Sequence, residues 1–347
     1  RWREMQCGQA EPYRVLPEEP ARFISGLRDV TAAISDHLAE SSSEPDGTLL
    51  RFHFDALHFL RLIDVFGAHS IIDLSIAPDS SASPRNEATL TLRNLLPAPH
   101  LRARFKAARA CVLFSATLTP LAFHRDTLGL PDDSAWIDVE APFVAGQLAV
   151  RIARDVSTRY HDRGASLGAV ADIIARQFDA APGNYLAFFS SFEYLLQVAA
   201  CFAERHPAVP IWAQSRGMPS VDRDAFLDRF TEVGTGVGFA VLGGSFGEGI
   251  DLPGRRLVGA FVATLGLPPF DPVNQHMRQR MEADFPGAGY QYAYLYPAIQ
   301  KVVQAVGRVI RTPDDRGVVH LIDDRFARPD VIRLLPAWWN AAAPHPL

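Results

Sequence analysis

Two arginines and a glutamine recur about one helical turn apart near the C-terminal end of the chain. The segment 304–311 reads QAVGRVIR, and a helix over it places Gln304, Arg308 and Arg311 on one face, opposite an apolar stripe. The planar guanidinium of arginine suits phosphate oxygens. Gly307 in a helix interior costs about 1 kcal/mol relative to alanine, which indicates that another group approaches the backbone closely. The pattern favours phosphate binding, and a solvated basic face with an incidental glycine is the alternative.

Two further polar segments directly follow apolar runs, as loops follow strands. SATL at 115–118 comes after CVLF at 111–114, and helix capping is its alternative role. GGSFGEGIDLPG at 243–254 is rich in glycine. Its proline cannot continue a helix, so a dinucleotide-binding fingerprint fits poorly. The segment therefore displays Glu248 and Asp251 on a loop, either for chemistry or as solvated acids of a tight turn.

A parallel sheet is the element that would bring these segments together. From about residue 88, apolar runs typical of buried strands alternate with helical stretches such as 166–179, 192–204 and 222–230. Ligands of such sheets bind beyond the carboxyl ends of the strands. The first 90 residues or so are mostly helical, over 17–40 and 51–66. The strand candidates are 111–114, 148–153, 185–189, 209–212, 238–242, 257–263 and 317–323.

The composition is that of an ordinary globular protein with a net charge of −5, 48% hydrophobic and 21% charged residues. This charge argues against a wholly basic nucleic-acid binder and permits a local basic groove. No apolar run reaches the roughly 20 residues of a membrane span, and no signal peptide is recognisable. Cys7, Cys111 and Cys201 are far apart, which favours a reduced, cytoplasmic setting. A chain of 347 residues predicts two domains, and the missing initiator Met suggests a fragment.

The order and wording of the polar segments resemble the XPD/DinG-like superfamily 2 DNA helicases over roughly residues 90–335. SATL, FGEGIDLPG (246–254) and QAVGRVIRTPDDRG (304–317) look like three of the family's motifs. YLAFFSSFEYL (185–195) resembles its nucleic-acid-contacting motif, and QSRGM (214–218) lies where the next one follows. The resemblance implies an α/β fold, a RecA-like parallel sheet with helices on both faces, preceded by a smaller, mainly helical region.

The resemblance also implies a division of the chain and roles for its residues. Residues 1–90 would be an arch-like region, 91–145 the end of the first motor domain with its linker, and 146–347 the second motor domain. Arg308 and Arg311 would be arginine fingers at the γ-phosphate of ATP, which can raise the rate of phosphoryl transfer by about 10³–10⁵. The remaining expected roles are sensing of the phosphate by Gln304, close packing at Gly307, nucleotide binding and coupling by Glu248, Gly249, Asp251, Ser115 and Thr117, and DNA contact by Ser190, Ser191 and Arg216.

Several parts of the family pattern are absent from the sequence. No Gly-Lys dipeptide is present for a phosphate-binding P-loop, and no Asp-Glu pair for the box that holds Mg²⁺. Three scattered cysteines cannot supply the four thiolates of a 4Fe–4S cluster. These parts precede the arch in the family. The chain thus resembles a C-terminal half whose N-terminal motor half would hold most of the ATP and Mg²⁺, and any such cluster.

The function predicted from the sequence is the C-terminal part of an ATP-dependent DNA helicase that translocates on single-stranded DNA and unwinds duplexes, 5′→3′ by family analogy. Its partners would be single-stranded DNA, duplex junctions and the N-terminal motor half, with no membrane, in a setting such as DNA repair. The chain alone is expected to be inactive. The alternative is a non-catalytic DNA- or protein-binding module derived from a helicase, although retention of the arginines favours a motor. An unrelated hydrolase would need a G-x-S-x-G elbow, which the sequence lacks.

Overall fold

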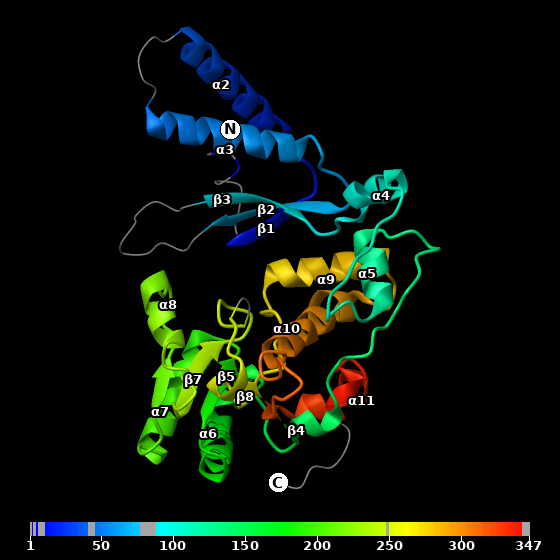
Figure 1. The fold of residues 1–347 in the computed structure, drawn as a ribbon. Coiled ribbons are helices and arrows are strands. Elements are labelled where there is room, and N and C mark those ends of the chain that lie inside the picture. The colour runs from blue at the N-terminus through cyan, green and yellow to red at the C-terminus, as the bar shows by residue number, and fades with distance from the viewer. Residues whose placement is uncertain are drawn as a thin grey trace. The chain divides into compact units, whose positions relative to one another are not determined.

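The computed structural model describes residues 2, 5, 11–40, 46–76, 88–247 and 250–341. The chain divides into two compact units (Figure 1). The first comprises Arg1–Val112 with His124–Ser134, and the second Leu113–Phe123 with Ala135–Leu347. Within the described ranges, none of the helices has the length and apolar character needed to span a membrane.

The first unit packs a helical hairpin on a three-stranded antiparallel sheet of order β1-β2-β3. Ile24 and Leu60 from the two hairpin helices meet Ile72 of the central strand in a small core. The helices predicted at 17–40 and 51–66 are confirmed, whereas the sheet was not predicted. The elements are β1 (Tyr13–Leu16), α2 (Ala21–Glu40), α3 (Gly47–Ile63), β2 (Ser70–Ile76), β3 (Ala88–Asn94) and α4 (Ala98–Ala107).

The second unit is built on a six-stranded parallel sheet of order β4-β9-β8-β5-β7-β6, which confirms the predicted fold class (Figure 1). The six strand predictions from residue 148 onward are confirmed to within a few residues. The strands are β4 (Leu148–Ala153), β5 (Asn184–Phe189), β6 (Ile211–Ala213), β7 (Gly236–Val241), β8 (Gly259–Ala263) and β9 (Gly317–Ile322). The helices are α6 (Arg163–Ala180), α7 (Phe192–Arg205), α8 (Ser220–Leu227), α9 (Pro272–Asp284), α10 (Tyr296–Val306) and α11 (Pro329–Ile332), with a π-helix at Gln291–Leu295. Helix α5 (Leu121–Leu128) precedes the sheet in sequence.

Helices cover both faces of this sheet. Alternate residues of β5 point to opposite faces, so that Phe188 packs with Val302 of α10 on one face and Phe189 packs with Val198 of α7 on the other. Because both faces are buried, the strands consist of nearly continuous apolar residues, which is what made them recognisable in the sequence.

The strand predicted at 111–114 is absent from the structure. CVLF has no regular secondary structure, and its side chains are exposed, at 82% for Val112 and 91% for Phe114. A strand forms only where a neighbouring strand takes up its backbone hydrogen bonds. No other described segment pairs with 111–114.

The carboxyl ends of all six parallel strands lie at one edge of the sheet. At this edge β7 lies between β5 and β6, so the loop that begins at Leu242 is flanked by Ser190 and by Gln214. The same edge carries Thr158 after β4 and Asp323 after β9. The topology thus gathers the glycine-rich loop, the serine pair and QSRGM at one edge, whereas SATL and the arginine segment do not follow a strand of this sheet.

Candidate functional site

Helix α10 ends earlier than predicted. Its last residue is Val306, and Gly307 is the C-cap, with φ −59° and ψ −3°. The prediction that Gly307 lies inside a helix, with Gln304, Arg308 and Arg311 on one helical face, is therefore wrong. A β-carbon at Gly307 would lie 3.1 Å from the carbonyl oxygen of Val303. The crowding that glycine avoids comes from the preceding turn of its own helix.

The tight turns after α10 nevertheless bring the two arginines together. Nη1 of Arg308 donates to the carbonyl oxygen of Ile250 at 2.8 Å, and Nη2 of Arg311 donates to the same oxygen at 3.0 Å. Nε of Arg311 lies 3.3 Å from Oδ1 of Asp251, whose side chain is 74% exposed. The predicted residues Arg308, Arg311 and Asp251 thus form one cluster. Glu248 and Gly249 lie outside the described residues.

A buried carboxylate fixes the backbone that carries Arg311. Oδ2 of Asp315 accepts hydrogen bonds from the N–H groups of Arg311 and Thr312 at 2.7 and 2.8 Å. Burial alone raises the pKa of Asp315, but these backbone hydrogen bonds outweigh it and hold the pKa below its ordinary value of 3.8. The arginine loop is therefore held in place by a charge that stays ionised near neutral pH.

Gln147 holds the other side of the same loop. Its Nε2 lies within hydrogen-bonding distance of three carbonyl oxygens, those of Thr312 at 3.3 Å, Pro313 at 2.9 Å and Asp315 at 3.2 Å. Its Oε1 accepts from the N–H of Val144 at 2.9 Å. Neither Gln147 nor the role of Asp315 was predicted. Asp315 lies in the segment QAVGRVIRTPDDRG that resembles a family motif, and this resemblance was the only signal for it. No local pattern distinguishes Gln147.

The SATL segment is attached to α10 through Gln300 and not through Gln304. Nε2 of Gln300 donates to the carbonyl oxygen of Thr117 at 3.1 Å. Oγ of Ser115 accepts from the N–H of Thr117 at 3.2 Å, so this hydroxyl orders a local turn. Gln304 is exposed on the helix surface. The alternative role of the segment, capping the next helix, is not seen for Ser115.

Ser190 and Ser191 end β5 and start α7, as the predicted strand and helix require. Oγ of Ser191 caps α7 by accepting from the N–H of Tyr194 at 3.2 Å, and its own hydrogen stays available to donate. Oγ of Ser190 is buried and has no hydrogen-bond partner among the described residues. The two serines therefore present one accessible hydroxyl.

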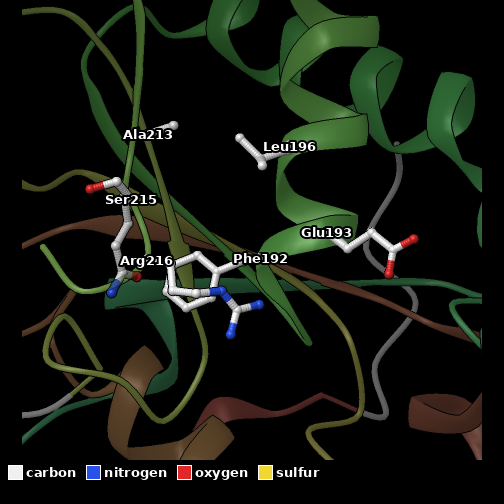
Figure 2. Close-up of a pocket in the computed structure, with 7 residues that line it drawn as sticks. Phe192, Glu193, Leu196, Ala213, Ser215 and Arg216 are labelled. Atoms are coloured by element: carbon white, nitrogen blue, oxygen red, sulfur yellow. The ribbon is translucent and has the colours of Figure 1, made fainter. Parts of the chain in front are cut away.

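A hollow of about 470 Å³ lies beside this helix start, between α7 and the end of β6 (Figure 2). The guanidinium of Arg216 lies over the ring of Phe192, 5.1 Å from its centroid, and Leu196 is 58% exposed. Apolar and cationic groups therefore share one wall. Phe192 and Leu196 were not predicted, although the aromatic residue after the serine pair was visible in the sequence.

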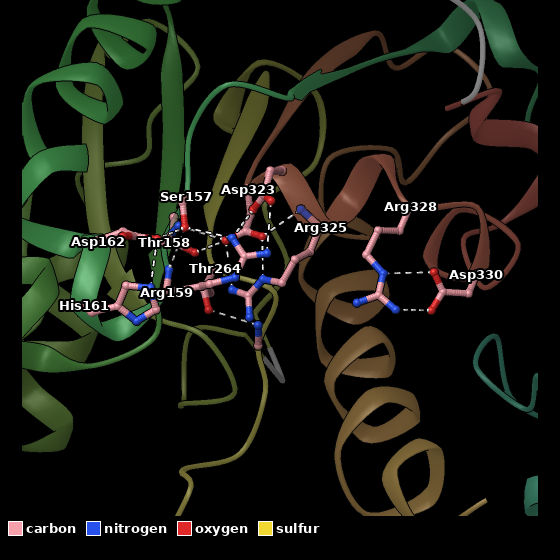
Figure 3. A network of polar contacts seen from close by, with 12 residues as sticks. Ser157, Thr158, Arg159, His161, Asp162, Thr264, Asp323, Arg325, Arg328 and Asp330 are labelled. Carbon is pink, nitrogen blue, oxygen red and sulfur yellow. Dashed lines mark hydrogen bonds and ion pairs between the residues drawn. The ribbon is translucent and has the colours of Figure 1, made fainter. Parts of the chain in front are cut away.

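A network of ion pairs braces the ends of β4 and β9 (Figure 3). Asp323 is fully buried and accepts from Nε and Nη2 of Arg325 at 2.6 and 2.9 Å, and from the N–H and hydroxyl of Thr158. Burial raises the pKa of Asp323, but its hydrogen bonds with Arg325 and Thr158 more than offset this and keep the pKa below normal. Arg159 makes a two-pronged pair with Asp324 at 2.7 and 3.0 Å. The network thus holds together the two segments that follow β4 and β9 at the carboxyl edge of the sheet.

Known proteins that are similar to this chain are helicases. A family model described as the helicase C-terminal domain matches residues 174–342. A probable ATP-dependent helicase of Methanocaldococcus jannaschii is 26% identical over 297 residues, covering 80% of this chain and 44% of that protein. The ATP-dependent helicase DinG of Mycobacterium tuberculosis is 29% identical over 265 residues, covering 73% of this chain and 38% of that protein.

The fold gives the same result. A solved structure of apo XPD superposes with a TM-score of 0.63 at 20% identity, covering 94% of this chain and 63% of the XPD chain. The chain is similar to the XPD- and DinG-type helicases. This confirms the resemblance carried by the three motifs and the RecA-like character of the parallel sheet. The chain spans less than half the length of the curated helicases it matches.

No metal centre is evident in the described part of the chain. No three His, Cys, Asp or Glu side chains come together there as metal ligands. Cys111 is exposed and Cys201 is half-buried, both with free thiols. Cys7 lies outside the described residues.

Proposed function

We propose that the chain is the C-terminal part of an ATP-dependent DNA helicase and supplies the second half of its ATP site. The observation that carries this proposal is the convergence of Arg308 and Arg311 on the carbonyl oxygen of Ile250, next to Asp251. The carbonyl oxygen orients both guanidinium groups toward one point, and Arg311 is also ion-paired with the exposed carboxylate of Asp251. Two positive charges held together in this way would stabilise the γ-phosphoryl group as it is transferred.

The residues of this chain fit one phosphate and not a whole nucleotide. A triphosphate with Mg²⁺ needs a phosphate-cradling loop and carboxylates for the metal, and the sequence lacks both the P-loop Gly-Lys dipeptide and the Asp-Glu pair. We therefore assign binding of ATP and Mg²⁺ mainly to an N-terminal motor half. When bound, ATP supplies the free energy for movement. In this chain Gln304 would sense its γ-phosphate, Glu248, Gly249 and Asp251 would couple the site to DNA, and Ser115 and Thr117 would relay the motion.

The exposed segment 111–114 supports the need for such a partner. Val112 and Phe114 have the composition of a buried strand and yet are almost fully solvated. A second RecA-like sheet with a free edge would take up their backbone hydrogen bonds and cover their side chains. The domain boundaries at residues 90 and 145 belong to the same proposal, with 91–145 as the end of the first motor domain and the linker to the second.

The substrate we propose is single-stranded DNA, along which the helicase would translocate in the 5′→3′ direction, with duplex junctions as the structures to be opened. Ser191 and Arg216 would contact it along the edge of the sheet where the strands end, and Ser190, whose Oγ is buried, would contribute only its backbone. The hydroxyl hydrogen of Ser191 can donate to a phosphate, and the Arg216–Phe192 pair offers a cation and a ring to a base.

DNA-stimulated ATPase activity tests this function. It should be measured on the full-length product of the gene and on this chain alone. We expect hydrolysis only from the full-length product, and loss of at least about 100-fold in kcat for Arg308→Ala or Arg311→Ala, as for other arginine fingers. Arg205→Ala, which removes an exposed arginine paired with Asp172, is the matched control and should retain activity.

Two results would count against the proposal. An inactive full-length product, or full activity without either arginine, would favour a non-catalytic DNA- or protein-binding module derived from a helicase. Hydrolysis by this chain alone would contradict the assignment of the ATP site to two halves. Unchanged far-UV circular dichroism of each variant must accompany any loss of activity.

A further inference from the structure

Lys301 stands out because lysine is nearly absent from this chain. The sequence contains two lysines, Lys106 and Lys301, while the other positive charges are arginines. Lys301 lies in the middle of α10, and its side chain packs against Gly243, in the first turn of the glycine-rich loop after β7. A β-carbon at Gly243 would lie 3.1 Å from Cδ and 3.7 Å from Nζ of Lys301. Gly243 also has a φ of +77°, which favours glycine at this position.

The loop beneath this lysine is folded into two successive turns. The N–H of Gly244 donates to the carbonyl of Val241 at 3.3 Å, and that of Gly247 donates to the carbonyl of Gly244 at 2.8 Å. The N–H groups of Gly243 and Ser245 have no backbone acceptor within the described residues. Both residues are exposed. N–H groups without a backbone acceptor on an exposed glycine turn can donate to an anion.

The ammonium of Lys301 is available for the same anion. Within the described ranges, Nζ makes no hydrogen bond or ion pair. Its aliphatic part packs on Gly243, which limits the motion of the charged end. The structure thus holds a cation above a loop that offers backbone donors.

The position of the loop decides which anion it would take. In the sheet order β5-β7-β6, this loop lies between the end of β5 with Ser191 and the end of β6 with Arg216. Arg308 lies just beyond Val306, the C-terminal residue of α10. At 1.5 Å per residue, Lys301 lies about 7 Å along the helix axis before Val306. Arg308 reaches the far end of the same loop, where its Nη2 lies 3.5 Å from the carbonyl oxygen of Gly247. Lys301 lies against Gly243 at the start of the loop, between the ends of β5 and β6, where the proposed DNA contacts are.

We propose that Lys301 and the turn at Gly243–Ser245 form a binding subsite for a backbone phosphate of single-stranded DNA. This inference rests on the proposed function and adds to it a residue and a place on the strand. Lys301 would bridge the contacts made by Ser191 and Arg216, so that three neighbouring loops follow one stretch of the sugar-phosphate backbone.

Binding of a fluorescein-labelled oligothymidylate of about 20 nucleotides, followed by anisotropy across a NaCl series, tests the subsite. Lys301→Met keeps the aliphatic stem on Gly243 and removes the charge. We expect its affinity to fall roughly 3- to 10-fold and the slope of log Kd against log[salt] to decrease by about 0.7, the value for one phosphate contact on a single strand. Lys301→Arg should retain most of the affinity, and Arg205→Gln, a charge loss near the end of α7, should change neither quantity.

Chemical footprinting gives an independent readout on the unmutated protein. Acetylation followed by mass spectrometry should show Lys301 protected by the oligonucleotide at low salt and exposed again at high salt. Equal modification of Lys301 with and without the oligonucleotide would overturn the subsite.

The outcomes separate this inference from the function on which it rests. Wild-type-like binding and salt slope in Lys301→Met, together with weakened binding in Arg216→Ala, would remove the lysine subsite and leave the DNA-binding edge. An unmutated protein that binds no oligonucleotide would remove both. A raised KM for ATP with unchanged DNA affinity in Lys301→Met would show that the lysine serves the nucleotide, which also overturns the subsite.

Discussion

The carboxylate of Asp315 lies 2.7 Å from the backbone nitrogen of Arg311 and accepts its hydrogen bond. The same oxygen accepts from Thr312, while Gln147 donates to the carbonyl groups of the loop. The loop that carries Arg311 is therefore held from both sides by residues that would not themselves touch ATP. This arrangement explains how an arginine outside any helix can be held in a defined position.

We expect Asp315→Asn to reduce the DNA-stimulated kcat of the full-length protein several-fold and to leave the Kd for DNA unchanged. Asparagine keeps the shape but loses the charge, so the N–H groups of Arg311 and Thr312 lose a charge-assisted partner worth about 1.5–3 kcal/mol. The matched control is Asp314→Asn, which changes an exposed neighbour. Asp315→Asn with wild-type kcat, or an equal effect of both variants, would contradict the positioning role.

Acid should weaken the same contact. The pKa of Asp315 is held below 3.8 in the folded protein. Its contribution to stability is therefore complete above the unfolded pKa of about 4 and is lost as the pH falls further, through the folded pKa. Urea unfolding at a series of pH values should show a smaller acid-induced loss of stability below about pH 4 in Asp315→Asn than in the unmutated protein. Parallel curves for the two proteins would contradict the prediction.

His320 should make stability depend on pH in a higher range. Burial lowers its pKa from 6.5 to about 3, with Arg151 and Arg176 adding to the shift, and its Nε2 pairs with Oε1 of Gln177 at 3.0 Å. The folded state then binds fewer protons than the unfolded state between these two values. The free energy of unfolding should fall by up to about 1.4 kcal/mol per pH unit as the pH drops through this range.

His320→Phe keeps a flat ring against Phe261 and cannot be protonated. Urea unfolding curves at a series of pH values should show a shallower decline between pH 6.5 and 4.5 for this variant. His58→Gln, which changes an exposed histidine on α3, should keep the wild-type slope. Equal slopes in all three proteins would show that His320 is protonated in the folded state.

The buried and surface ion pairs of Figure 3 should differ in their effect on stability. Asp323→Ala leaves the guanidinium of Arg325, which is 14% exposed, without its carboxylate, and should destabilise the protein by about 3–5 kcal/mol. Asp330→Ala breaks the pair with Arg328, in which both side chains are at least 41% exposed, and should cost about 0–1 kcal/mol. Urea unfolding followed by circular dichroism measures both values, and similar losses would contradict the burial argument.

The sequence predicted the parts of the fold in which local composition determines structure. Strands β5, β7 and β8 were recognisable because burial on both faces requires a continuous apolar run. Strand β2 was missed because its pattern includes Asp73, which is buried only because Arg93 of β3 pairs with it at 2.5 Å. A cross-strand ion pair between residues 20 positions apart leaves no local pattern.

The site was predicted less completely than the fold, because its contacts join distant segments. The types of Arg308 and Arg311 indicated phosphate binding, but their geometry depends on a helix that ends at Val306 and on a loop fixed by Gln147, 165 residues away from Thr312. For CVLF, local composition predicted a strand that the structure does not contain. Its composition is that of a strand, and no described neighbour is present to make it one.

The contact between Gln300 and Thr117 should couple ATP hydrolysis to movement along DNA. Gln300→Ala removes the hydrogen bond of 3.1 Å to the carbonyl oxygen of Thr117, while Thr117→Ala keeps that carbonyl and removes only a hydroxyl. In the full-length protein we expect Gln300→Ala to keep at least about half of the DNA-stimulated ATPase activity and to lose roughly 5-fold in unwinding rate, because one hydrogen bond contributes about 1 kcal/mol. Gln279→Ala, at an exposed position on α9, is the control.

If Gln300→Ala lowers ATPase and unwinding in proportion, the residue serves the chemistry of hydrolysis and not its coupling. If Thr117→Ala reproduces the uncoupling, the hydroxyl and not the carbonyl carries the effect.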